Sequence, residues 1–351
     1  MFNKLKERIK KFSCIVTLYE KSVIGYYKLR TRIYEEVRKY RPIHYGDKNR
    51  GKVFFRISFE PSALGLYSII LEIMIPYIRF ALRRGWIPVI DLKGMHIPLM
   101  QDEDRREIEN SWEYYYGQPI KGYTLEDVYQ SKNVLEAKWW FRKVKGPQWK
   151  TMFPTNKKEL KYWHNFIKSY IRLNSDMENR LALEREKIFK PGQKVLGVGI
   201  RAGLRHGAMR NMKFFNDHPK QPTCEEMMEI VEEKMKEWNC SHLFLSCDDR
   251  EYSNKFISKW GDKCYHLNRK LNHYFENDEP VSIYKVNVEF EGSSVRDKTG
   301  DYLVETYLLA ECDCFYSCHG GGATFAYFLN GGKYERVEVY DRGVYSGLQN
   351  G

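Results

Sequence analysis

Six consecutive residues without a polar side chain, Val195 to Ile200, constrain the fold of this chain more than any other feature. The segment is short, lies between a Pro-Gly turn and Arg201, and so predicts a strand buried in a sheet. The elements expected after it are helix 223–238, strand 242–246, a helix from Asp249, strand 263–266, helix 301–311, strand 313–317, helix 323–329 and strand 336–340. This alternation is typical of a parallel sheet covered by helices.

The residues before this strand carry a second set of the same kind. The elements expected there are strand 53–57, helix 66–84, strand 86–90, short helices and loops over 98–134, and one long helix over 156–188. A chain of 351 residues is too long for one ordinary core. We therefore expect an α/β protein with two Rossmann-like domains that face a cleft. The expected boundaries are residues 1–50 for an N-terminal arm and linker, 51–190 for the first domain and 191–351 for the second.

The positive charge of the chain is concentrated in the N-terminal arm. The net charge is +12, and residues 1–41 supply +8 of it, from twelve Lys or Arg against four Glu. Apolar residues at Phe2, Leu5, Ile9, Phe12 and Val16 have helical spacing and are flanked by lysines. Such a helix can lie on an anionic membrane surface, or it can pack on the body of the protein with a solvated basic face. Because the excess charge is confined to the arm, nucleic-acid binding is not expected.

The cysteines and the apolar runs indicate an intracellular protein. There are eight cysteines, none forms a C-x-x-C pair, and no histidine pair has zinc-ligand spacing, so we expect reduced thiols and no metal site. No stretch approaches the ~18 apolar residues of a membrane span, and no signal peptide is evident. The expected location is cytoplasmic, with a peripheral position on the inner face of the plasma membrane if the arm binds lipid.

Three loops at strand ends are candidates for a ligand site, since ligands of open α/β sheets bind beyond the carboxyl ends of the strands. The first follows the Val195–Ile200 strand and offers Arg201 and Arg205, which suit a pyrophosphate or are surface arginines. The second is Asp248-Asp249, which can bind a ribose or base edge, or can cap the next helix. The third is His319 with Gly320, Gly321 and Gly322, where glycines let a phosphate approach backbone N–H groups. Together they predict a nucleotide site.

An ordered set of motifs resembles bacterial polysaccharide-cluster glycosyltransferases of the α-1,6-fucosyltransferase and protein O-fucosyltransferase superfamily. The matching segments are 84–89, 112–119, 123–129, 195–201, His218 to Pro222, Phe244 to Asp249, Tyr302 to Leu309 and Phe328 to Tyr334. The resemblance covers roughly residues 53–345. It implies a GT-B enzyme that uses a GDP-sugar, often GDP-fucose, and needs no metal or other cofactor.

The resemblance also assigns roles to single residues. Arg201 matches the first arginine of the family's His-x-Arg-Arg-x-Asp motif and is implied to bind the β-phosphate, with Arg205 as a following basic residue. Ala202 and Leu204 stand where the family has its second arginine and its aspartate. His218 opens a further donor-side motif, and Asp248 and Asp249 match the family's Asp-Asp pair. Glu305 stands where fucosyltransferases have an aspartate in the helix before the last motif.

The expected reaction moves a sugar, with fucose as the best candidate, to a saccharide or lipid-linked saccharide acceptor with inversion. Arginine and backbone N–H groups can stabilise the charge that grows on the leaving diphosphate, so a metal is not required. Inversion needs a base, and the candidates are Glu60, in the loop after the first strand, His206 and Glu305. A solvated or helix-capping role is the alternative for Glu60. The competing interpretation of the whole chain is a non-catalytic sugar- or nucleotide-binding module, because Ala202 and Leu204 depart from the motif.

Overall fold

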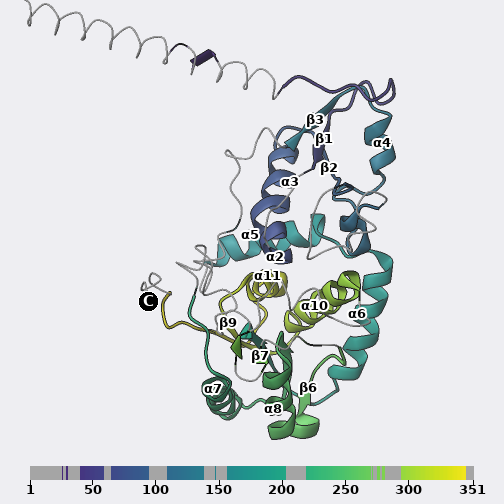
Figure 1. Ribbon diagram of the computed structural model, residues 1–351. Coiled ribbons are helices and arrows are strands. Elements are labelled where there is room, and N and C mark those ends of the chain that lie inside the picture. The colour runs from purple at the N-terminus through teal and green to yellow at the C-terminus, as the bar shows by residue number, and fades with distance from the viewer. Residues whose placement is uncertain are drawn as a thin grey trace, which may run out of the picture.

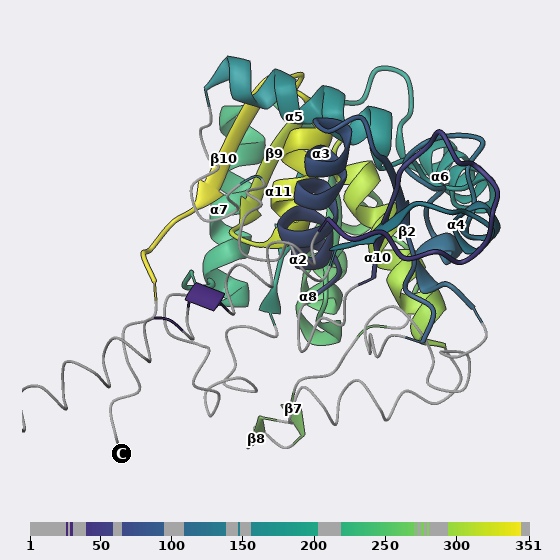
Figure 2. The same cartoon turned by 90° about the horizontal axis from the view of Figure 1, so that it is seen from above.

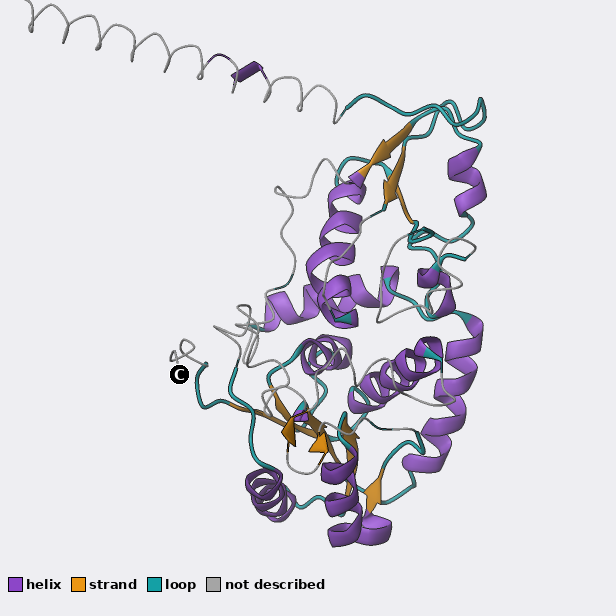
Figure 3. Cartoon of the chain, in the orientation of Figure 1, coloured by secondary structure: helices purple, strands orange, loops and turns teal. Residues whose placement is uncertain are grey.

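The computed structural model places one parallel β-sheet in each half of the molecule, with helices between the two sheets (Figures 1 and 3). It describes residues 26, 29–30, 40–58, 65–94, 109–137, 147, 156–202, 219–269, 271, 275–276, 279–280 and 294–344. The expectation of an α/β fold with parallel sheets is confirmed. The amphipathic stripe predicted for the arm, Phe2 to Val16, lies outside the described residues.

The first sheet has three parallel strands in the order β2-β1-β3. They are β1 (Phe54–Ile57), β2 (Ile87–Ile90) and β3 (Val134–Glu136). Phe55 and Ile57 point into the main core, whereas Phe54 packs on the other face with Val128 of α4 (Leu125–Tyr129). The sequence did not predict β3, because a three-residue strand has too little pattern of its own and exists only through its pairing with β1.

The predicted crossover helix between β1 and β2 is present but contains a wide turn. It consists of α2 (Leu66–Ile69), the π-helical segment η1 (Ile70–Met74) and α3 (Ile75–Leu82). The wide turn ends two residues before Pro76, which has no N–H to donate to the turn before it. The helix ends at Leu82, and a turn over residues 83–85 follows, in which Gly85 has a left-handed φ of 69° before the chain enters β2.

Part of the predicted linker, residues 42–52, is paired with the first sheet. Ile43 forms an antiparallel bridge with Val134 of β3, and Lys48 forms a parallel bridge with Ser131. This segment is therefore tied to the sheet edge by backbone hydrogen bonds. A short 3-10 helix, η3 (Ser111–Tyr114), lies between β2 and α4.

The single long helix predicted over 156–188 is wrong, because the structure has two helices, α5 (Lys157–Tyr170) and α6 (Ser175–Ile188). Between them Leu173 forms an antiparallel bridge with Tyr116. Asn174 then caps α6 by accepting a hydrogen bond from the N–H of Met177 at 2.9 Å. The break depends on a distant segment of the chain, which the local helical periodicity cannot reveal.

The second sheet has five parallel strands in the order β10-β9-β4-β5-β6 and agrees closely with the sequence prediction. The strands are β4 (Val195–Ile200), β5 (His242–Cys247), β6 (Cys264–Tyr265), β9 (Cys314–Cys318) and β10 (Arg336–Tyr340). The helices are α7 (Cys224–Glu237), α8 (Arg250–Trp260), the 3-10 turn η8 (Gly261–Lys263), α10 (Val295–Leu309) and α11 (Gly321–Asn330). A two-stranded antiparallel ribbon is formed by β7 (Phe275–Glu276) and β8 (Glu279–Pro280).

The starts of two of these helices can be compared with the sequence prediction. The capping box at Thr223 and Glu226 is present, with Thr223 Oγ1 accepting from the Glu226 N–H at 2.9 Å. The helix predicted over 301–311 begins earlier, after the N-cap Ser294. Helices α7 and α8 cover one face of the second sheet, and α10 and α11 cover the other (Figure 1).

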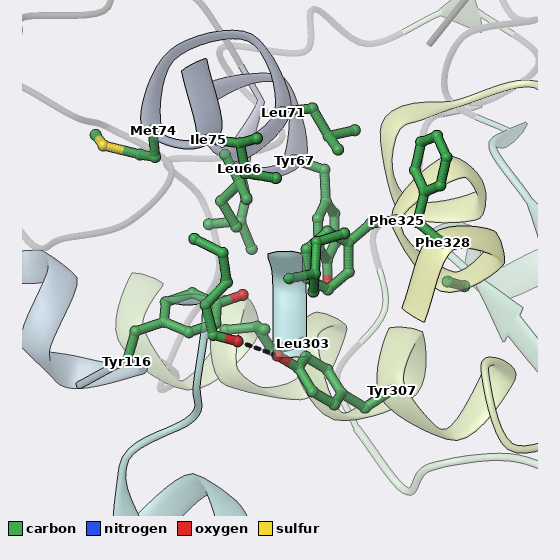
Figure 4. Close-up of a cluster of buried hydrophobic side chains, with 14 of the residues drawn as sticks. Leu66, Tyr67, Leu71, Met74, Ile75, Tyr116, Leu303, Tyr307, Phe325 and Phe328 are labelled. Carbon is green, nitrogen blue, oxygen red and sulfur yellow. Dashed lines mark hydrogen bonds between the residues drawn. The ribbon is translucent and has the colours of Figure 1, made fainter. Parts of the chain in front are cut away.

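One hydrophobic cluster joins the helices of both halves. Figure 4 shows Leu66, Tyr67 and Leu71 from the first half against Phe325 and Phe328 of α11. In the same cluster the Tyr307 hydroxyl donates to the carbonyl of Ile171 at 3.4 Å. Helix α5 packs against α11 (Figure 2), and α6 packs against α10. Helices α5 and α6, which precede the predicted boundary at residue 190, are therefore packed on the second half.

Candidate functional site

Arg201 stands at the carboxyl end of β4, the central strand of the second sheet, and lies between a carboxylate and an aromatic ring. Its Nε is 3.6 Å from Oδ2 of Asp248, which follows β5. Its guanidinium carbon is 5.9 Å from the ring centre of Tyr302 on α10. The Arg201 side chain is 37% exposed, so it can still reach a ligand. Two of the predicted strand-end loops are thus brought together.

The predicted glycine turn is the start of α11, and its three glycines have different surroundings. Gly320 is the N-cap residue, and a Cβ built there would lie 3.5 Å from Cγ of Arg201. A Cβ at Gly321 would lie 3.0 Å from Cβ of Tyr67, and one at Gly322 would overlap the Tyr302 hydroxyl. Gly321 and Gly322 are therefore required by close packing. Gly320 has no side chain that could cap the helix. The backbone N–H groups of the first turn of α11 therefore have no side-chain cap, and this turn lies beside Arg201.

These strand ends enclose a small pocket. It is lined by Gly199, Ile200, Arg201, Ser246, Tyr302, Thr306, Leu309, Ser317, Cys318, Gly320, Gly322 and Ala323. The lining combines one cationic side chain, several hydroxyl groups and the amino end of a helix. Such a combination suits an anionic group that needs charge and hydrogen-bond donors together.

The two adjacent aspartates have separate roles. Asp249 is 1% exposed, and its Oδ1 accepts a hydrogen bond from the Tyr252 N–H at 2.9 Å, so it caps α8. The capping alternative for Asp249 is thereby confirmed. The other aspartate, Asp248, forms the ion pair with Arg201 beside the pocket.

Glu305 is buried in α10 and holds an ion pair with Arg269, which follows β6. Arg269 Nε donates to Glu305 Oε1 at 2.6 Å, and its Nη2 donates to Oε2 at 2.8 Å. The Ser246 hydroxyl also donates to Oε2, at 2.8 Å. Burial raises the pKa of Glu305, and the Arg269 guanidinium opposes this rise. Burial by itself lowers the pKa of Arg269, but the Glu305 carboxylate raises it by more, so the pKa of Arg269 lies above its ordinary value.

A further predicted position lies at the third strand end. His319 follows β9 in a buried position, and burial lowers the pKa of its imidazole. Its carbonyl accepts a hydrogen bond from Nε2 of Gln221 at 3.3 Å. Gln221 belongs to the 218–222 motif, which therefore reaches the end of β9.

Four candidates cannot be placed. Glu60, Arg205, His206 and His218 lie outside the described residues. Of the predicted positions, Arg201, Gly320 and Gly322 line one pocket, and Asp248 pairs with Arg201 beside it.

Two residues at this site were not singled out from the sequence. The Tyr302 ring faces the Arg201 guanidinium, and Arg269 ties β5 to α10. A signal existed for Tyr302, since it begins the 302–309 motif and lies three residues before Glu305, on the same helix face. Arg269 had only its place just after a predicted strand.

The described residues hold no group of three or more His, Cys, Asp or Glu side chains that could bind a metal ion. Within the same part of the chain, no helix has the length and apolar character needed to cross a bilayer.

No known protein family and no curated protein matches the chain. Solved structures similar to it include the α-1,6-fucosyltransferase NodZ soaked with GDP-fucose, at 13% identity and a TM-score of 0.48, covering 83% of this chain and 96% of that one. The fucosyltransferase NodZ from Bradyrhizobium is similar at 15% identity and a TM-score of 0.46, with the same coverage. POFUT1 in complex with GDP is similar at 8% identity and a TM-score of 0.43, covering 82% and 98%. These structural neighbours are fucosyltransferases.

Proposed function

We propose that this chain is a glycosyltransferase of the GT-B type that binds a GDP-sugar, with GDP-fucose as the best candidate, at the carboxyl edge of its second sheet. The observation that carries the proposal is the position of Arg201. It lies between Asp248 and the first turn of α11, at a pocket beyond the carboxyl end of the central strand β4. The motif resemblance supplies the donor class, and the first sheet would form the acceptor side.

A diphosphate fits the charge pattern of this pocket. A guanidinium can donate two parallel hydrogen bonds to phosphate oxygens. The amino end of α11 adds the partial positive charge of the helix dipole. It also adds backbone N–H groups to which the cap residue, a glycine, offers no side-chain acceptor. Asp248 can orient Arg201 or accept a hydrogen bond from the ribose or base. Tyr302 supports the guanidinium from the α10 side.

The same groups would act in the reaction. The sugar–phosphate bond breaks as negative charge grows on the leaving GDP, and Arg201 with the α11 amides would stabilise that charge without a metal. Transfer with inversion needs a base on the opposite face of the sugar. Both carboxylate oxygens of Glu305 are occupied by Arg269 and Ser246, which leaves Glu60 and His206 as the candidates for this base.

The acceptor and location form a further part of the proposal. The acceptor would be a saccharide or lipid-linked saccharide in cell-surface polysaccharide synthesis. The transfer would take place at the inner face of the plasma membrane. The +8 charge of residues 1–41 supports attachment to anionic lipid. Co-sedimentation with phosphatidylglycerol vesicles at low salt tests this. A chain lacking residues 1–41 should stay in solution and keep its donor chemistry, and the full chain should be released at about 1 M salt.

The donor proposal is tested by thermal shift with GDP, UDP and CDP. A ligand at a hundredfold excess over Kd stabilises the folded state by about 2.7 kcal/mol, and we expect a selective shift with GDP. Release of GDP from GDP-fucose then tests whether the chain has transferase activity. The same measurement with EDTA tests whether this activity is independent of metal. A shift with UDP or CDP alone would contradict the assignment of the base.

A second candidate function is a non-catalytic nucleotide- or sugar-binding module on the same fold. It is favoured by Ala202 and Leu204, which replace the second arginine and the aspartate of the family motif. Ala202 is 1% exposed and apolar, so it adds no charge to the pocket. Binding of GDP-fucose without turnover across a panel of oligosaccharide acceptors would decide for this module.

A further inference from the structure

A fourth strand end, that of β6, contributes a residue that the proposed function does not use. Arg269 lies four residues after β6, and its side chain is only 9% exposed. Besides its two bonds to Glu305, it donates through Nη2 to the carbonyl of Cys247 at 2.8 Å. One guanidinium therefore links the segment after β6 to the last residue of β5 and to α10. Arg269, Glu305 and Cys247 are not among the residues that line the pocket.

We propose that Arg269 is a positioning residue for the phosphate site, an inference that rests on the proposed function. The Cys247 carbonyl belongs to the peptide unit that leads directly into Asp248. Fixing that carbonyl fixes the backbone from which Asp248 reaches Arg201. Asp248 in turn restrains the Arg201 guanidinium, so Arg269 acts on the pocket through two contacts in series.

The bond to Glu305 restrains a second part of the pocket. With both oxygens held by Arg269, Glu305 presents Oε2 to the Ser246 hydroxyl at 2.8 Å. Ser246 lines the pocket, and Tyr302 lies one turn before Glu305 on α10. The ion pair thus holds the end of β5 and the pocket face of α10 in one arrangement. A fixed arrangement of this kind is what binding of a diphosphate requires, since poorly oriented donors lose affinity.

The test must separate positioning from simple loss of stability. Removing one member of a buried ion pair leaves an uncompensated charge and is strongly destabilising, so single neutral variants are ambiguous. The double variant R269Q/E305Q removes both charges and keeps an acceptor for Ser246, but the shorter amide side chain at position 269 cannot hold the Cys247 carbonyl. The control for the bidentate geometry is R185Q/E311Q, a partly exposed pair (42% for Arg185 and 32% for Glu311), so R269K remains the variant that separates positioning from stability. That pair is also bidentate, at 2.5 Å for both bonds, and Glu311 lies just after the far end of α10.

The measurements are calorimetric titration with GDP and amide hydrogen exchange of residues 247–252. We expect R269Q/E305Q to raise the Kd for GDP by about tenfold or more, and R185Q/E311Q to stay within about twofold of wild type. The single variant R269K, which keeps the charge but has no fork, should recover the melting temperature more than the affinity. A folded R269Q/E305Q that binds GDP as wild type does would overturn the proposal.

Failure of the proposed function gives a different pattern. If wild type binds no GDP, the donor assignment fails, and hydrogen exchange alone decides the role of Arg269. Faster exchange at Asp248 and Asp249 in R269Q/E305Q, with wild-type exchange in the control, supports positioning of this segment. Equal exchange in both double variants overturns it. If R269Q/E305Q does not fold, R269K decides by the same two measurements.

Discussion

The Arg201 side chain is restrained on two sides and still reaches the pocket. Asp248 and Tyr302 contact its guanidinium, while 37% of the side chain remains exposed. A restrained cation loses little conformational entropy when it binds an anion, which is a large part of what makes such a site selective. The affinity for a diphosphate should therefore depend on this side chain more than on any other described residue of the pocket.

We expect Arg201→Ala to weaken GDP binding by about tenfold to a hundredfold, since a hydrogen bond to a charged group contributes about 1.5–3 kcal/mol. Arg201→Lys should recover little of this loss, because an ammonium cannot make the bidentate contact. Isothermal titration with GDP measures both. Lys194→Ala is the matched control, since this lysine pairs with Glu335 at the opposite end of β4. Wild-type affinity in R201A would remove the phosphate site from β4.

His319 should make stability depend on pH. Burial lowers the pKa of its imidazole, against the opposing effect of Asp341. An unfolded histidine titrates near about 6.5, so below that pH the unfolded state binds more protons than the folded state. The free energy of unfolding is therefore highest, as far as His319 is concerned, above about pH 6.5. It falls as the pH drops through the lower folded-state pKa of this histidine. Urea unfolding at several pH values should show a smaller loss on acidification for His319→Gln than for wild type; equal losses would contradict this.

Much of this site could be predicted because it follows from one geometric rule. Parallel strands end at the same edge, so Arg201, Asp248 and Gly320 had to come close together once the strands were recognised. The division of roles between Asp248 and Asp249 could not be predicted, since either residue can cap the next helix. The Arg269–Glu305 pair spans 36 residues of sequence, and no local pattern predicts such a pairing.

At the scale of elements, the sequence predicts the helices and strands that have a residue pattern of their own. It does not predict the elements that form only through contacts with distant segments of the chain. The β4 strand has the same bounds in the sequence prediction and in the structure, because its six residues are all buried. The turn between α5 and α6 is different. There the N–H of Gly117 donates to the Arg172 carbonyl, and the N–H of Asn174 donates to the Tyr115 carbonyl. These bonds replace helical ones that the local sequence would equally allow.

We expect Asn174→Ala to destabilise the protein by more than about 1 kcal/mol, the typical loss for removing a side chain that caps a helix. The same side chain donates through Nδ2 to the Glu113 carbonyl at 2.9 Å, so the loss should exceed that of a simple cap. Asn174→Ser keeps the capping oxygen and should lie between alanine and wild type. The free energy of unfolding in urea measures the series. An unchanged value for alanine would show that tertiary contacts alone set the break.

At the scale of the whole molecule, the helices between the two sheets form a shared core. Tyr67 of α2 lies 4.9 Å from Phe325 of α11, measured between ring centres. Helices α5 and α6 bury apolar side chains in the same cluster. A division at residue 190 would therefore cut through a continuous hydrophobic layer, although the sequence composition suggests a boundary there.

The shared core predicts that both sheets unfold together. Leu71→Ala should cost about 2–5 kcal/mol, because Leu71 is fully buried in the cluster between the two sheets. If the molecule is one cooperative unit, hydrogen exchange should accelerate equally at Phe54 in β1 and at Leu196 in β4, although neither belongs to that cluster. A fragment of residues 191–351 would expose the faces of α10 and α11 that α2, α5 and α6 cover, so it should bind hydrophobic dyes and aggregate. Independent folding of that fragment, or acceleration in only one sheet, would show instead that the two halves are separate folding units joined by a weak interface.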